Sequence, residues 1–190
     1  MAMPASKASR FFDRVDRQEL MICQTINGYL RFRFVLPYFK IASRLGDGWF
    51  WYVLILLMPL LHPEAGLALA LLMTTTGLIC TLTYKLLKRN LVRERPFISF
   101  PVINCATPPL DRYSFPSGHT LHAVCFNTLL ALTLPELAWA ILPFTLSVAI
   151  SRVVLGLHYP SDVLAGVVIG GTMGALAASG LPAFKLLTLA

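Results

Sequence analysis

The chain has 190 residues, of which 56% are hydrophobic and 13% charged, and its formal net charge is +7. A water-soluble domain rarely has so few charged residues, so this composition argues against a soluble protein and favours the lipid bilayer as solvent. Nucleic acid is a poor candidate partner, because most of the chain outside the basic clusters is apolar. We expect membrane lipids as the surroundings instead.

Residues 1–48 form a basic, aromatic-rich segment. Charged side chains interrupt residues 1–19, where a cleavable signal would need an apolar region, so we expect this segment to be retained. Aromatic and basic residues alternate along residues 11–44, as in a helix that lies at the membrane interface. The alternative is that Leu20–Phe39 crosses the membrane, which would bury Arg31 and Arg33 at about 2.5–3.5 kcal/mol each near the bilayer centre.

Residues 49–190 contain the apolar runs and are expected to form one transmembrane domain. A spanning helix needs roughly 20 predominantly apolar residues. The second and fifth runs meet this length, whereas the first is too short unless it draws in flanking residues. We therefore predict an all-α bundle of five or six spans. The runs are Trp49–Leu61, Ala65–Leu87, Thr120–Leu134, Leu137–Ile150 and Val163–Leu181.

Two polar connections separate these runs. The stretch from Lys88 to His119 contains several prolines, so it cannot be one continuous helix and is predicted to be a structured loop. A shorter connection runs from Arg152 to Asp162. If the two intervening runs each cross once, both connections emerge on the same face of the membrane. This argument does not depend on how the N-terminal segment is threaded.

The last run carries a glycine at every fourth position: Gly166, Gly170 and Gly174. Such a stripe lets another helix backbone approach closely. Packing within the chain is the simpler interpretation, and a dimer contact is the alternative. The sequence leaves the oligomeric state open.

The two polar connections hold three clusters that could carry chemistry. The first, Lys88 to Pro96, could alone be a basic helix terminus. The second, Pro116-Ser117-Gly118-His119, precedes an apolar run. Ser117 there is a good helix N-cap, and the free N–H groups at a helix start can bind a phosphate.

The third cluster places His158 four residues before Asp162 and follows Ser151-Arg152. At this spacing Asp162 can accept a hydrogen bond from one ring nitrogen of His158 and leave the other free to attack. The histidines and Asp162 also have metal-ligand chemistry, with His119 and His122 nearby. The surrounding cations would repel a divalent ion, so we expect neither a metal nor another cofactor.

Together the three clusters resemble the three-part signature of the type 2 phosphatidic acid phosphatase superfamily, which includes acid phosphatases and vanadium haloperoxidases. Every signature position is matched: Lys88-x6-Arg95-Pro96, Pro116-Ser117-Gly118-His119 and Ser151-Arg152-x5-His158-x3-Asp162. The resemblance implies that His158 attacks phosphorus, Asp162 orients it, and His119 is the acid and base. It also implies which groups hold the phosphoryl oxygens: Lys88, Arg95, Ser117, Gly118 and Arg152.

We therefore expect a membrane lipid phosphate phosphatase that acts on phosphatidate, phosphatidylglycerol phosphate or a polyprenyl diphosphate. A phosphotransferase using the same intermediate and a non-catalytic lipid-binding protein are the alternatives. A haloperoxidase would have no use for the membrane setting. Five spans with the basic N-terminal region inside would place the site on the cytoplasmic face. Six spans, which the resemblance favours for a bacterial plasma-membrane member, would place it outside.

Overall fold

A computed structural model describes residues 7–180, and this part of the chain is helical with no strand. The last residue of the Val163–Leu181 run lies outside the described residues. In chain order the elements are α1 (Lys7–Asn27), the 3₁₀ turn η1 (Gly28–Arg31), α2 (Val35–Arg44), the π-helical turn η2 (Leu45–Trp49), α3 (Phe50–Leu61), α4 (Gly66–Asn90), α5 (Pro96–Ser99), α6 (Gly118–Thr133), α7 (Pro135–Val154) and α8 (Pro160–Ser179).

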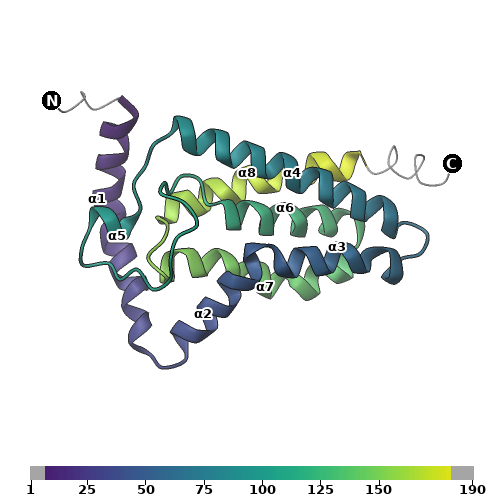
Figure 1. The fold of residues 1–190 in the computed structure, drawn as a ribbon, viewed down its shortest axis with the longest axis horizontal. Coiled ribbons are helices and arrows are strands. Elements are labelled where there is room, and N and C mark those ends of the chain that lie inside the picture. Colours follow the sequence, from purple (N-terminus) through teal and green to yellow (C-terminus); the bar gives the residue numbers. More distant parts are fainter. Residues whose placement is uncertain (1–6, 181–190) are drawn as a thin grey trace.

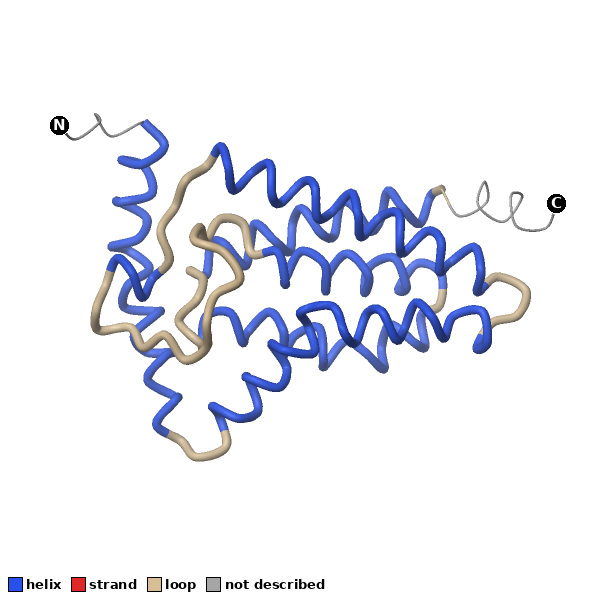
Figure 2. The backbone as a smooth tube through the Cα atoms, viewed as in Figure 1, coloured by secondary structure: helices blue, strands red, loops and turns tan. Residues whose placement is uncertain are grey.

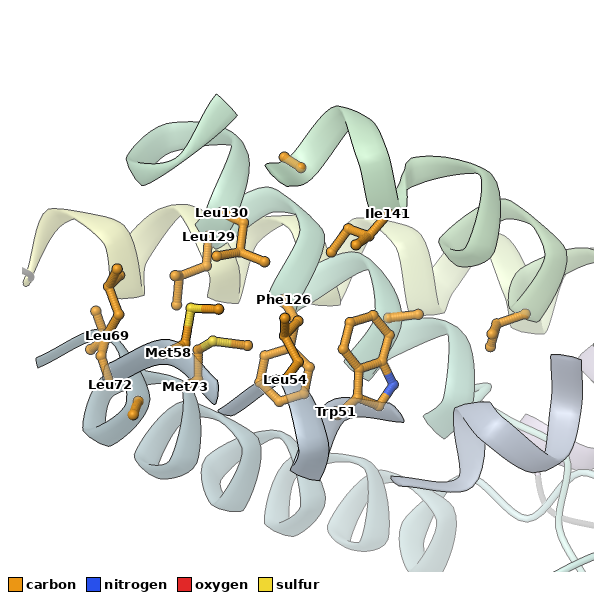
Figure 3. Close-up of a cluster of buried hydrophobic side chains, with 14 residues drawn as sticks. Trp51, Leu54, Met58, Leu69, Leu72, Met73, Phe126, Leu129, Leu130 and Ile141 are labelled. Atoms are coloured by element: carbon orange, nitrogen blue, oxygen red, sulfur yellow. The ribbon is translucent and has the colours of Figure 1, made fainter. Parts of the chain in front are cut away.

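Helices α3, α4, α6, α7 and α8 run alongside one another as a bundle, and α6 packs against both α7 and α8 (Figure 1). The core lies between α3, α4, α6 and α7, where Trp51, Met58, Met73, Phe126 and Leu129 interlock (Figure 3). Tight packing of large apolar side chains of this kind resembles a soluble core. It holds the bundle together from the inside.

The outer surface of the bundle is also apolar, which a soluble protein would not tolerate on this scale. Leu56, Leu78, Trp139 and Leu164 are each more than 60% exposed. Four stretches of the described chain are long and apolar enough to cross a membrane: Val35–Leu61, Gly66–Asn90, Pro135–Val154 and Pro160–Ser179. The protein is therefore an integral membrane protein.

The N-terminal region differs from a single crossing at Leu20–Phe39. Helix α1 ends at Asn27, and the chain turns through residues 28–34 before α2 begins. Helix α1 lies across one end of the bundle (Figure 1). The helical stretch from Val35 then continues through a kink at Gly48, where φ is 132°, into α3. The short Trp49 run thus draws in flanking residues. The first candidate span, Val35–Leu61, therefore overlaps the segment of residues 1–48 that was expected to be interfacial.

The long loop of residues 91–117 and the turn of residues 155–159 lie at the end of the bundle that α1 crosses (Figure 2). The short turns at residues 62–65 and at Leu134 lie at the opposite end. The two polar connections lie at the same end of the bundle, as the crossing argument predicted. All three motif clusters therefore lie close together at the end of the bundle that α1 crosses.

Candidate active site

The three clusters line one cavity of about 490 Å³. Its polar end lies at the loop end of the bundle, and its apolar part extends between α3 and α4 toward Ile55 and Met73. The polar lining comes from Asp47, Lys88, Arg95, Asp111, His119, Arg152 and His158, and the apolar lining includes Trp51, Tyr52, Leu56 and Leu78. A ligand with a charged head group and an apolar body would match this separation of polar and apolar lining.

Local structure explains where the motif residues lie, of which Ser117 and Asp162 are buried behind the cavity lining. Lys88 lies in the last turn of α4, and Arg152 lies in the last turn of α7. Ser117 is the N-cap of α6, as expected, and its hydroxyl accepts a hydrogen bond from the Thr120 N–H at 3.4 Å. The backbone N–H of Ser117 donates to the Asp162 carbonyl at 3.1 Å, which joins the second cluster to the third.

His158 is 2% exposed and lies in the turn before α8. Arg95 Nη1 lies 3.1 Å from His158 Nε2. A guanidinium has only donors, so Nε2 is the acceptor and the ring proton is on Nδ1. Burial, followed by the charges of Arg95 and Arg152, lowers the pKa of His158 well below its ordinary value of 6.5. The imidazole is therefore neutral, with the lone pair of Nε2 directed at Arg95.

The expected hydrogen bond between His158 and Asp162 is not formed. His158 Nδ1 is 3.5 Å from Asp162 Oδ2, and it has no hydrogen-bond partner within the described part of the chain. His158 lies outside the helix, because α8 begins only at Pro160, and the reach that was expected even for a first helical turn falls short. Asp162 Oδ2 accepts from the Tyr159 N–H at 2.9 Å, and Oδ1 accepts from Arg93 Nη1 at 2.6 Å. The carboxylate oxygen Oδ2 thus faces Nδ1 of the neutral imidazole without accepting a hydrogen bond from it.

Lys88 and Arg95 are bound to a carboxylate of the long loop. Lys88 Nζ donates to both oxygens of Asp111, at 2.8 and 2.9 Å, and Arg95 Nη2 donates to Oδ1 at 2.8 Å. Burial acts to raise the pKa of Asp111, but Lys88 and then Arg95 outweigh it and hold that pKa below its usual value. An anion is thus already held where the motif cations converge.

Arg152 completes the group of cations. Its Nη1 donates to Ser43 Oγ of α2 at 2.6 Å, while its buried Nε has no partner among the described residues. Ser151, the neighbouring motif residue, donates to the Val148 carbonyl of its own helix at 2.6 Å. It does not line the cavity. Arg152 therefore has a free donor for an anion. The Ser151 side chain is bonded to the backbone of its own helix, α7.

His119 is the second residue of α6 and lines the cavity, and its Nε2 is hydrogen-bonded to Asp47 Oδ1 from the kink before α3. Gly118 lies against the Tyr84 ring, where a Cβ would be at 3.4 Å. His122 lies 2.9 Å from the Gly118 carbonyl and 3.1 Å from the Gly77 carbonyl of α4. His122 thus ties two helices together, whereas His119 has a carboxylate partner inside the cavity.

Sequence reasoning missed three charged residues of this site: Arg93, Asp47 and Asp111. None belongs to the three signature patterns, and each contacts a signature residue far away in sequence. A signal for Asp47 was present, since it is a lone carboxylate between two glycines inside an otherwise apolar stretch. Charged residues at membrane depth are generally functional or paired.

The fold and the cavity define a class: an integral membrane helix bundle with histidines, carboxylates and several cations around one pocket. A family model described as the PAP2 superfamily matches residues 65–185. The chain belongs to this superfamily. The match includes every residue of the three clusters.

Curated relatives and a solved structure agree with this assignment. Decaprenylphosphoryl-5-phosphoribose phosphatase of Mycobacterium tuberculosis is 40% identical over 93 residues, which cover 48% of this chain and 49% of the relative. Lipid A 1-phosphatase of Rhizobium etli is 34% identical over 108 residues, covering 55% and 47%. The matches span about half the length of these relatives. LpxE of Aquifex aeolicus has the same fold, with a TM-score of 0.73 and 24% identity over 85% of this chain and 95% of that one.

Proposed function

We propose that this protein is a metal-independent lipid phosphate phosphatase that works through a phosphohistidine. One observation carries the proposal: the neutral Nε2 of His158 points at the donors of Arg95, beside Lys88 and Arg152, at the polar end of an apolar cavity. A nucleophile surrounded by fixed cations suits phosphoryl transfer, which depends on positioning and on stabilising charge on the phosphoryl oxygens.

The reaction follows from the geometry in two steps. The lone pair of Nε2 attacks phosphorus, the bond from phosphorus to the leaving oxygen breaks, and His119 gives that oxygen its proton. His119 then takes a proton from water, whose oxygen attacks phosphorus and breaks the bond to Nε2. Asp162 faces Nδ1 and balances the charge that the ring gains. Ser117, the N–H of Gly118 and the motif cations hold the phosphoryl oxygens.

The shape of the cavity supports a lipid as the substrate. Its apolar part lies between α3 and α4, and Tyr52, Leu56 and Leu78 on its lining are more than half exposed toward the lipid side. A lipid chain can occupy this part while the phosphate reaches the cations. The named relatives act on a decaprenyl-linked sugar phosphate and on the 1-phosphate of lipid A, and we propose this class, lipid phosphates with long apolar chains, for this chain.

Phosphate release by the detergent-purified protein tests the proposal. The panel holds phosphatidate, phosphatidylglycerol phosphate and a polyprenyl diphosphate, each in excess chelator, with His158→Ala and the exposed-site variant Arg89→Gln alongside. We expect release from at least one lipid, lost in His158→Ala and kept in Arg89→Gln. No release by the folded native protein overturns the proposal, and a phosphorylated second lipid among the products would identify a phosphotransferase.

We also propose five spans, with α6 as the fifth, and an active site on the cytoplasmic face. Helix α6 has 16 residues and runs between longer neighbours that meet the length of a span. Basic residues concentrate at the loop end, including Arg31, Arg33 and Arg112, whereas the turn at residues 62–65 and Leu134 carry none. The positive-inside tendency then places the loop end in the cytoplasm. The break in the helix between Asn27 and Val35 supports five crossings over the six that the resemblance favours.

A native thiol tests this orientation. Cys105 on the long loop is exposed, whereas Cys23, Cys80 and Cys125 are buried. A membrane-impermeant maleimide should label Cys105 in inverted vesicles and not in intact cells, and Cys105→Ser should abolish the labelling. A Glu64→Cys, Cys105→Ser protein should show the reverse. Labelling of Cys105 from outside intact cells would place the site on the extracytoplasmic face.

A further inference from the structure

A buried network outside the family signature surrounds Arg93, which is 1% exposed. Its Nη1 donates to Asp162 Oδ1 at 2.6 Å and to Ser161 Oγ at 2.7 Å. Its Nε donates to Asp16 Oδ1 at 2.8 Å, and Nη2 donates to Glu19 Oε2 at 2.8 Å. One guanidinium thus joins the carboxylate beside the nucleophile to two carboxylates of α1.

Helix α1 is docked to the bundle through one face that carries both polar and apolar side chains. The inward stripe contains Phe12, Asp16, Glu19, Cys23 and Asn27, spaced so that they share one helix face. On the other face Met21 and Ile22 are exposed, which suits contact with lipid. The helix therefore directs Asp16 and Glu19 toward the active site, while Met21 and Ile22 face away from it.

Glu19 also holds the start of α8. Its Oε1 accepts the Ser161 N–H at 2.7 Å, and its Oε2 accepts the Ser161 hydroxyl at 2.7 Å. Pro160 has no N–H, so Ser161 carries the first free backbone donor of the helix that bears Asp162. A carboxylate at this place satisfies that donor and interacts favourably with the helix dipole. The position of α8 is thereby fixed from α1.

Arg93 determines which oxygen of Asp162 faces the nucleophile. Its bond to Oδ1 leaves Oδ2 to the Tyr159 N–H and to His158 Nδ1 at 3.5 Å. The guanidinium also lies 4.0 Å from the centre of the Tyr159 ring, directly beside His158 in sequence. Without Arg93 the carboxylate could turn, and its ionised form would lose the cation that stabilises it in a buried setting.

We propose that Arg93 is a positioning residue for the nucleophile, acting through Asp162, and that Asp16 and Glu19 make the N-terminal helix part of this positioning apparatus. This inference rests on the proposed function, because its readout is phosphate release. It assigns α1 a role in orienting His158 in addition to contact with the membrane surface.

Kinetics of Arg93→Gln, Arg93→Lys and Glu19→Gln test the proposal in the full-length protein, with Arg89→Gln and Gln18→Ala as matched controls on exposed positions. We expect kcat to fall about ten- to hundredfold in Arg93→Gln and less in Glu19→Gln, as for other residues that orient a reacting group. Arg93→Lys should recover part of the loss. Competitive inhibition by inorganic orthophosphate should stay within about twofold, because the phosphate-holding residues are untouched.

The double variant Arg93→Gln, Glu19→Gln should be about as slow as Arg93→Gln alone, since both residues act through one network. A kcat within twofold of native in folded Arg93→Gln overturns the inference, as does an unchanged kcat in folded Glu19→Gln if Arg93→Gln does not fold. So does a parallel loss of kcat and orthophosphate binding, which indicates general unfolding of the site. If the native protein itself releases no phosphate, the proposed function has failed instead, and that outcome is distinct from an active native protein with unaffected variants.

Discussion

Asp111 occupies the place where the motif cations would hold a phosphate. Its carboxylate is bound by Lys88 and Arg95, and its side chain is 39% exposed on the side of the cavity formed by the long loop. A carboxylate with two accepting oxygens resembles part of a phosphate in its hydrogen bonding. A bound phosphoryl group must therefore share these donors with Asp111 or displace it.

The Asp111→Asn variant should bind phosphate more tightly. The amide keeps the shape of the side chain but removes the negative charge that competes for Lys88 and Arg95. We expect the inhibition constant for orthophosphate to fall about three- to tenfold, equivalent to roughly 1 kcal/mol. Glu94→Gln, an exposed acid paired with Arg112 at 3.4 Å, is the control and should have little effect. Weaker phosphate binding in Asp111→Asn would mean that Asp111 organises the cations.

Asp47 is the hydrogen-bond partner of His119. It lies on the kink before α3 and accepts a hydrogen bond from His119 Nε2. A carboxylate in this place orients the ring and stabilises the positive charge that His119 gains when it takes a proton from water. Asp47→Asn should lower kcat about tenfold or more with little change in KM. Steady-state kinetics beside Glu64→Gln, at the opposite end of the bundle, would check this, and an unchanged kcat would contradict it.

At this scale the signature identified which residues line the cavity but not which carboxylates contact them. Lys88, Arg95, His119, Arg152 and His158 all reach the cavity from the predicted clusters. The partners Asp47, Arg93 and Asp111 come from a kink and a loop whose conformations depend on the packed structure. Spacing along the chain could not place them, and for the same reason it placed the His158–Asp162 hydrogen bond incorrectly.

Among the elements, α6 and α8 bring two clusters together. Gly170 lies against the Leu121 carbonyl and Gly174 against the Cys125 carbonyl, so close that a Cβ would overlap the α6 backbone. Gly166 faces the Ser117 carbonyl, where a Cβ would be at 2.9 Å. The stripe therefore packs within the chain, as its simpler interpretation predicted. Close contact here sets Ser117 beside Asp162.

The stripe provides a matched pair of substitutions. Gly170→Ala introduces a methyl group that α6 has no room for, at a typical cost of about 1–3 kcal/mol. Gly171→Ala, one residue on, meets only side-chain atoms at 3.9 Å or beyond and should gain helix propensity of about 1 kcal/mol. Thermal unfolding in detergent should show a lower midpoint for Gly170→Ala and an equal or higher one for Gly171→Ala. Equal midpoints would contradict the intrachain role.

Over the whole molecule, the crossing argument from the apolar runs predicted which loops share a face, because each run must cross the membrane whole. The path of residues 1–48 was not predictable in the same way. Their charges and aromatic residues fit both an interfacial helix and a costly span. The choice depends on contacts such as that of Asn27 Nδ2 with the Asn104 carbonyl at 3.0 Å, which link distant parts of the chain.

The buried, neutral His158 should also make the stability of the whole protein depend on pH. Its pKa lies well below 6.5 in the folded protein, because burial and then Arg95 and Arg152 oppose protonation, whereas in the unfolded chain the ordinary value of 6.5 applies. Between these two values the unfolded chain binds one more proton than the folded protein. The free energy of unfolding therefore falls as the pH drops below about 6.5, by up to about 1.4 kcal/mol per pH unit, and levels off below the folded pKa.

Replacing His158 isolates this contribution from those of the other titratable groups. The His158→Gln variant cannot take up the proton, so its thermal midpoint should fall less steeply than that of the native protein between about pH 7 and pH 5. Each midpoint is compared with its own value at about pH 8, where His158 is neutral in both the folded and unfolded states. If the two proteins lose stability in parallel, the folded protein takes up the proton as readily as the unfolded chain. His158 would then not be held neutral by its surroundings, and the nucleophile would lose its lone pair to protonation at mildly acidic pH.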